Sequence, residues 1–221
     1  SGKSWVCRNI MEQKKNIPAA IVISPTEKLN SFYGNFIPPI YIYNKYDSSI
    51  LSRVYGRQAQ MMEDNKIRVA KGKKTKDDRL FLIMDDCMSS KGKWLKDDQI
   101  LELFFNGRHH HVSFILTMQF SLGIPPELRS NFDYIFLLGE DFISNRKRLY
   151  EHYAGMFPTF DIFQQVFNEV TSDFGCMVIN NKIHSKKLEE KVFWFKATPT
   201  AKFDIGNKFY KKYSNKNFDE N

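Results

Sequence analysis

Short apolar segments alternate with segments of helical periodicity along the whole chain. Turn residues such as Ser24-Pro25 and Gly139 bound the apolar segments, as is typical of buried strands. All of them are far shorter than the roughly 20 apolar residues of a membrane-spanning helix, so no transmembrane segment is predicted. This alternation predicts an α/β fold, with a mostly parallel sheet covered by helices on both faces. The predicted strands are 19–23, 40–43, 80–85, 112–118, 134–138, 176–179 and 192–195.

Helices are predicted between these strands. Asp47 is placed to cap the longest of them, in which Ile50, Leu51 and Val54 lie along one broad apolar side. The predicted helices are 4–13, 47–65, 97–105, 143–153 and 160–170.

Two basic segments lie outside these elements. The connection from Lys66 to Arg79 has Lys71-Gly72-Lys73-Lys74 at its centre. Its stretch from Lys66 to Lys76 is either a DNA-facing element or a solvated connector, and solvation is the better explanation for any single lysine in it. From Lys208 onward the chain is rich in Lys and Asn, so a frayed tail is expected. We therefore predict one domain over 1–207 and a tail over 208–221.

The composition is that of one globular domain in a reducing compartment. The chain has 221 residues, of which 42% are hydrophobic and 15% aromatic, enough for a single well-formed core. Its cysteines, Cys7, Cys87 and Cys176, are odd in number and far apart. Their spacing argues against both a disulfide framework and a zinc site.

The net charge is +8 and the pI is about 9.2. A basic surface suits a polyanionic partner, mainly through contacts with phosphates. Ordinary solubility charge explains it equally well, so the charge supports a nucleic-acid partner without establishing one.

The first four residues match the end of a phosphate-binding loop. Such a loop wraps backbone N–H groups around phosphate, its lysine reaches the β/γ oxygens, and its Ser or Thr hydroxyl binds Mg²⁺. Ser1, Gly2, Lys3 and Ser4 supply this pattern, and a helix starting at Ser4 would aim its N-terminus at the phosphates. The pattern is short and lacks the leading glycine, so a flexible terminal segment is the alternative when it is taken alone.

Two adjacent acids strengthen the nucleotide hypothesis. Asp85 and Asp86 follow a buried apolar run, and an acid at such a strand end can hold the Mg²⁺ shell while the next acid deprotonates the attacking water. Acids also end strands for capping reasons. The pair behind a lysine loop nevertheless favours ATP and Mg²⁺ as ligands.

Three more polar residues are candidates for the same site. Gln119 ends the strand after the acidic strand and would sense the γ-phosphate, or be a plain loop residue. Arg108 and Arg129 are rivals for an arginine finger that stabilises transition-state charge, and a surface or structural role is as good an explanation for each. The run from His109 to His111 is not expected to bind a metal, because consecutive side chains on an extended segment point to alternating sides.

With these motifs in place, the chain resembles the FtsK–HerA group of ring ATPases, and within it the genome-packaging ATPase of poxviruses and other large DNA viruses. The matching segments run in the family's order over nearly the whole chain. They are 1–4, 21–26, 80–86, 107–109, 117–119, 125–131 and 192–197.

The resemblance implies a RecA-like P-loop NTPase in which the Gln119 strand lies between the lysine-loop strand and the acidic strand. It implies a homo-oligomeric ring, expected to be a hexamer, with ATP bound between subunits and double-stranded DNA moved through the centre. Capsid or inner-membrane components are further expected partners, and the host cytoplasm and the virion are the expected locations. By position, Lys3 and Ser4 match the phosphate loop, Asp85 the Mg²⁺ acid, Asp86 the catalytic acid, and Arg108 the finger.

Two features depart from the family pattern. Many members carry Asp-Glu where this chain has Asp85-Asp86, although the viral branch is similar to this chain. The first strand and the front of the phosphate loop are also not in the sequence, so we expect poor nucleotide binding by these residues alone. A cellular or plasmid-type DNA-transfer pump and a non-hydrolysing assembly module remain alternatives to a packaging motor.

Overall fold

The computed structural model describes residues 2–87, 93–119 and 123–218. They form two compact units, and each is named here by its sheet. The parallel unit consists of 10–118 and 200–221, and the antiparallel unit consists of 1–9 and 119–199. The single domain predicted over 1–207 remains a prediction.

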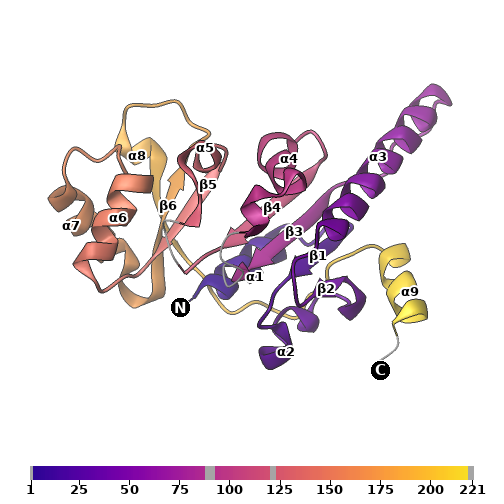
Figure 1. The fold of residues 1–221 in the computed structure, drawn as a ribbon, viewed down its shortest axis with the longest axis horizontal. Helices are drawn as coiled ribbons and strands as arrows, with labels where there is room; N and C mark the ends of the chain where they lie inside the picture. Colours follow the sequence, from indigo (N-terminus) through magenta and orange to yellow (C-terminus); the bar gives the residue numbers. More distant parts are fainter. Residues whose placement is uncertain (1, 88–92, 120–122, 219–221) are drawn as a thin grey trace. The chain divides into compact units, whose positions relative to one another are not determined.

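The parallel unit contains a four-stranded parallel sheet in the order β2-β1-β3-β4 (Figure 1). Its strands lie where the apolar segments predicted them, except that the first turn of the predicted 40–43 strand is a 3₁₀ helix (Pro39–Tyr41). Pro39 begins this helix, where its fixed φ suits a helical turn and its missing N–H breaks no intrahelical bond. The strands are β1 (Ala20–Ile23), β2 (Ile42–Tyr43), β3 (Leu80–Asp85) and β4 (Val112–Thr117).

Both faces of this sheet are covered. One face carries a core that includes Met11 of α1, the aromatic segment around Tyr33 and Phe36, and Phe203 near the C-terminus. On the other face, Phe104 of α4 packs edge-on against Phe114 of β4, with ring centroids 5.4 Å apart. The helices of this unit are the end of α1 (Lys3–Gln13), α2 (Glu27–Asn30), α3 (Ser48–Ala70), α4 (Asp98–Asn106) and α9 (Lys208–Asn217).

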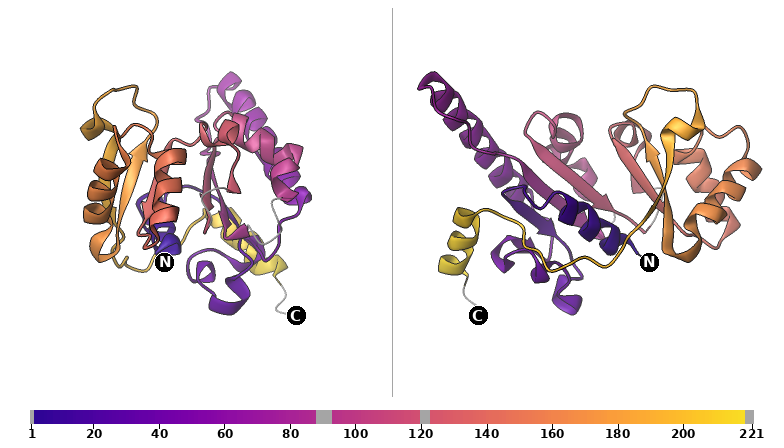
Figure 2. Two further views of the ribbon diagram at one scale, coloured as in Figure 1. Left: turned by 60° about the vertical axis from the view of Figure 1, so that its left-hand side comes forward. Right: turned by 180° about the vertical axis from the view of Figure 1, so that it is seen from behind.

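The long helix α3 begins as predicted but ends later. The Asp47 carboxylate caps it by accepting a hydrogen bond from the Ser49 N–H at 2.9 Å. The predicted end at residue 65 was wrong, because the helix continues to Ala70 and takes in the first part of the basic connection. Its buried residues all lie in its first half, and its second half projects from the parallel unit in two views (Figures 1 and 2).

The C-terminal segment is a docked helix, so the expected frayed tail was wrong for residues 208–217. The Tyr210 ring stacks on Tyr41 with centroids 3.8 Å apart, and the Tyr210 hydroxyl donates a hydrogen bond to the Ala20 carbonyl. The Tyr41 hydroxyl donates in turn to the Tyr210 carbonyl at 3.0 Å. One partly buried aromatic side chain therefore anchors a helix whose other aromatic residues, Phe209 and Tyr213, are exposed.

The antiparallel unit contains a three-stranded sheet in the order β5-β6-β7. The last two predicted strands pair antiparallel, and the 134–138 strand is antiparallel to β6, so these three strands depart from the mostly parallel arrangement that was predicted. A core with Phe163 and Phe167 of α7 covers one face. The elements are α5 (Pro126–Arg129), β5 (Tyr134–Leu138), α6 (Ile143–Tyr153), α7 (Phe160–Thr171), β6 (Gly175–Asn180), α8 (Leu188–Lys191) and β7 (Val192–Lys196).

None of the helices in the described part of the chain combines the length and the apolar character that crossing a bilayer requires.

Candidate functional site

The two predicted acids lie at the carboxyl end of β3, where parallel α/β sheets bind ligands. Every residue of β3 is buried, and Asp85, its last residue, is 4% exposed. Asp86 follows with a backbone φ of +55°, in the left-handed region that non-glycine residues rarely adopt. Such a conformation costs about 1–3 kcal/mol and persists only where surrounding contacts hold it, as they often do at functional sites.

Thr117 supplies two contacts that hold this turn. It ends β4 directly opposite Asp85 in the parallel register, and its side chain is on the same face of the sheet. Its hydroxyl accepts a hydrogen bond from the Asp86 N–H at 3.1 Å and donates one to Asp85 Oδ1 at 2.5 Å. One buried hydroxyl thus fixes the backbone of one acid and the carboxylate of the other.

Cys87 ties the same turn to the strand on the other side. Its thiol donates to the Ile23 carbonyl at the end of β1, with the sulfur 3.2 Å from the oxygen. Burial, with smaller contributions from the charges of Asp85 and Asp86, raises the pKa of the Cys87 thiol to about 12. The thiol is therefore a neutral donor at physiological pH, and both strands flanking β3 hold the acidic turn.

The end of the phosphate-loop pattern is at the start of α1, in the antiparallel unit. The helix begins at Lys3, and the Val6 N–H donates to the Gly2 carbonyl at 3.0 Å. The first turn contains no acidic residue to neutralise its N–H groups, so the turn is suited to an anion. Ser1 lies outside the described residues.

The predicted γ-phosphate sensor, Gln119, and the predicted finger, Arg108, are both exposed, after β4 and after α4 respectively. Gln119 is exposed two residues beyond the end of β4. Arg108 is exposed in the turn after α4, where its carbonyl accepts a hydrogen bond from the His111 N–H at 3.0 Å.

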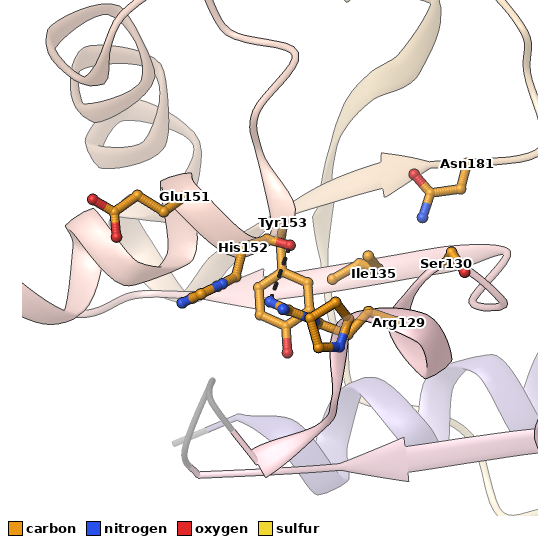
Figure 3. Close-up of a pocket in the computed structure, with 8 residues that line it drawn as sticks. Arg129, Ser130, Ile135, Glu151, His152, Tyr153 and Asn181 are labelled. Atoms are coloured by element: carbon orange, nitrogen blue, oxygen red, sulfur yellow. Dashed lines mark hydrogen bonds between the residues drawn. The ribbon is translucent and has the colours of Figure 1, made fainter. Parts of the chain in front are cut away.

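Arg129, the rival finger, is engaged within its own unit (Figure 3). Its guanidinium lies 5.5 Å from the centroid of the Tyr153 ring and donates to the His152 carbonyl at 3.4 Å. It lines a groove of about 390 Å³ together with Ser130 and Asn181. These contacts lie within the antiparallel unit, and the choice between Arg108 and Arg129 as the finger stays a prediction.

Two residues of the histidine run, His110 and His111, each pair with a different acid. His110 Nε2 lies 3.0 Å from Glu102 Oε1, and His111 Nδ1 lies 2.8 Å from Asp78 Oδ1. These pairs join the turn before β4 to α4 and to the segment before β3, which is a packing role.

The structure thus joins Asp85, Asp86 and Thr117 within one unit. Lys3, Ser4 and Gln119 belong to the other unit, and their convergence on the acids stays a prediction. Sequence reasoning gave Thr117 no role, because a strand-end threonine is common and only the strand register sets it opposite Asp85.

Comparison with known proteins identifies the family. A family model described as Poxvirus A32 protein matches residues 7–147. The chain belongs to this family. A protein of Acanthamoeba polyphaga mimivirus is 43% identical over 219 residues, covering 97% of this chain and 76% of that protein. A protein of Invertebrate iridescent virus 3 is 36% identical over 198 residues, covering 89% of this chain and 72% of that protein.

Solved structures establish the fold of this A32-family protein. The genome packaging NTPase B204 from Sulfolobus turreted icosahedral virus 2, in complex with AMPPCP, matches with a TM-score of 0.58. The match has 14% sequence identity and covers 90% of this chain and 93% of that one. The same NTPase in complex with ATP-gammaS matches with a TM-score of 0.57 at 15% identity, covering 89% of this chain and 92% of that one. The predicted α/β fold of P-loop packaging NTPases is therefore confirmed.

Proposed function

We propose that this A32-family protein is an ATP-hydrolysing motor that moves double-stranded DNA into a viral capsid. The observation that carries the proposal is the acidic turn of Asp85 and Asp86, held by Thr117 at the carboxyl end of a parallel sheet. The family and the packaging NTPases that share the fold support it. A ring of identical subunits of the FtsK–HerA type, working in the cytoplasm of the infected cell, belongs to the same proposal.

In this proposal Asp86 is the general base. Its carboxylate takes a proton from a water that attacks the γ-phosphorus of ATP, the bond from phosphorus to the bridging oxygen breaks, and ADP leaves. The left-handed backbone at Asp86 sets the direction of its side chain, and the Thr117 hydroxyl keeps that backbone in place. Lys3 stabilises charge on the β/γ oxygens, and Gln119 senses the γ-phosphate.

The donor set also suits Mg²⁺, a hard cation that prefers oxygen ligands. The Asp85 carboxylate and the Ser4 hydroxyl are oxygen donors of the kind that Mg²⁺-ATP sites use, and both are proposed to hold the ion. Mg²⁺ held there would neutralise the negative charge that develops on the phosphates as the bond to ADP breaks.

The test is ATP turnover by the protein with a complete phosphate loop, measured with and without double-stranded DNA. We expect DNA to stimulate turnover, and Lys3→Ala and Asp86→Asn each to abolish it. An oligomeric, folded protein without turnover would refute the motor and leave a binding or assembly module. Normal turnover in either variant would refute the residue roles.

A finger acting in trans has its own test. Arg108→Ala subunits, inactive alone, should regain partial turnover when mixed with Asp86→Asn subunits, because the mixture contains interfaces with one intact acid and one intact arginine. Arg129→Ala is the control, which should not complement if Arg129 is structural. Mixed rings without recovery would exclude a finger at Arg108.

A further inference from the structure

The projecting end of α3 and the segment that returns from it form a basic arm, defined as residues 61–76. Its stretch from Lys66 to Lys76 contains six basic residues and no acidic one. From residue 61 to Ala70, where the helix ends, α3 rises by roughly 15 Å. Figures 1 and 2 show that this part extends beyond the strands of the parallel unit. The arm therefore holds a concentrated positive charge away from the sheet.

The arm has a defined structure, because side-chain hydrogen bonds hold its return segment against the helix. The Asn65 side-chain amide donates to the Lys76 carbonyl at 2.9 Å, and its oxygen accepts from the Lys76 N–H at 2.8 Å. Arg68 Nε donates to the Lys74 carbonyl at 2.7 Å. At the tip, Gly72 turns the chain with a φ of +65°. The positions of the tip lysines are thus fixed at the backbone.

Buried hydrogen bonds anchor the base of the arm. The side chain of Gln58 is fully buried, and its amide donates to the carbonyls of Asp78 and His110 at 2.8 and 2.6 Å. These bonds join the helix to the segment before β3 and to the turn before β4. Breaking them inside the protein would leave buried polar groups unpaired, which costs about 1–3 kcal/mol for each group.

The tip carries charge that the described part of the protein does not neutralise. Lys71, Lys73, Lys74 and Lys76 are exposed, and none has an acidic partner among the described residues. The nearest acid along the chain, Asp77, is already paired with Arg79 at 2.6 Å. Surface charge that only confers solubility mixes both signs, so an ordered single-sign cluster indicates a polyanionic partner.

A lysine-rich tip is better suited to binding the phosphates of a nucleic acid than to recognising the edges of its bases. The lysine ammonium is a point charge on a flexible stem, which can contact successive phosphates without reading sequence. A DNA motor needs contacts of this kind because it has to accept any sequence. We propose that the basic arm contacts the phosphate backbone of double-stranded DNA through Lys71, Lys73 and Lys74. This inference rests on the proposed DNA-translocating function.

The test compares two triple variants of equal charge change in the same unit. The arm variant is Lys71→Gln, Lys73→Gln and Lys74→Gln. The control variant is Lys208→Gln, Lys212→Gln and Lys216→Gln, which removes three exposed lysines from successive turns of α9. Binding to a fluorescent duplex is measured by anisotropy from 50 to 200 mM salt, for both variants and the unaltered protein.

We expect the arm variant to bind more weakly and with a smaller salt dependence. Three lost phosphate contacts would reduce the slope of log K against log[salt] by about 2.7, so the rise from 50 to 200 mM salt would cost the variant about 40-fold less affinity than the unaltered protein. The control variant should bind like the unaltered protein.

Three results would overturn the inference in distinguishable ways. Equal losses in the two variants would mean that total charge, and not the arm, sets affinity. Unchanged DNA binding by the arm variant, with its oligomers lost on size-exclusion chromatography, would make the arm a subunit contact. An unaltered protein that hydrolyses ATP but binds no duplex would refute the DNA function itself.

Discussion

Removing the Thr117 hydroxyl should lower both stability and turnover, because this one group forms hydrogen bonds with both candidate acids. Thr117→Val keeps the shape of the side chain and removes only the hydroxyl. The variant loses the donor to Asp85 Oδ1 and the acceptor of the Asp86 N–H, at a position that is 7% exposed. A hydrogen bond to a charged group contributes about 1.5–3 kcal/mol, so we expect the free energy of unfolding to fall by about 2–3 kcal/mol.

The effect on catalysis follows from the backbone of Asp86. Its φ of +55° is unfavourable, and Thr117→Val removes the oxygen that accepts from its N–H, so we expect the backbone of Asp86 to shift. A displacement of about 1 Å in a catalytic group can reduce turnover about 100-fold. We therefore expect kcat to fall by one to two orders of magnitude in Thr117→Val, with a smaller change in KM.

Thr117→Ser is the matched control, because it keeps the hydroxyl and loses a methyl group. It should cost about 0.8 kcal/mol of stability and leave most of the turnover. Urea denaturation and steady-state ATP turnover measure the two quantities. The reasoning fails if Thr117→Val matches the unaltered protein in both, or if Thr117→Ser falls as far as Thr117→Val, which would assign the effect to packing.

Two further predictions concern parts of the parallel unit away from the phosphate loop. The folded protein holds the pKa of Cys87 at about 12, above the ordinary 9.0, so its stabilising contribution is complete below pH 9 and is lost as the pH rises toward 12. Titration of this thiol should lower the free energy of unfolding by about 1 kcal/mol between pH 8.5 and 10. Cys87→Ala should flatten the plot of unfolding free energy against pH. Equal slopes of that plot in the two proteins would contradict the assignment. Tyr210→Ala should release α9 and cost about 3 kcal/mol, because it removes the stacking on Tyr41 and the hydrogen bond to the Ala20 carbonyl. Limited proteolysis should then cut within 208–217, and Tyr210→Phe, which keeps the ring, should resist cleavage; equal resistance of the two variants would show that another contact holds the helix.

Local patterns predicted the elements whose evidence lies within a few residues. The strands at 80–85 and 134–138 and the helix at 143–153 have the predicted bounds, because apolar runs and helical periodicity are local properties. The Asp47 cap was likewise readable from its place before a helical pattern.

The rest depended on contacts between distant residues. The Thr117 bridge requires the register of β4 against β3, which a single sequence does not display. The helical end of α3 was read as a connection because it is polar, although Lys, Arg and Ala favour helix and Asn65 holds its return segment. The frayed tail was predicted from its Lys- and Asn-rich composition. In the structure Tyr210 docks this segment on Ala20, which is far away in sequence.

The candidate acids and the basic arm are joined by a single strand. The return segment of the arm leads directly into β3, and β3 ends at Asp85. A six-residue strand spans roughly 20 Å, is buried throughout, and pairs with β1 and β4 along its length. The first half of α3 is buried at Ile50, Leu51 and Val54, and Gln58 bonds it to the segments before β3 and β4, so the base of the arm is tied to the sheet that presents the acids. A motor needs its DNA contact to be mechanically coupled to its hydrolytic residues if hydrolysis is to move DNA. This placement predicts that the arm variant loses the DNA stimulation of ATP turnover together with DNA binding, whereas the α9 control keeps both.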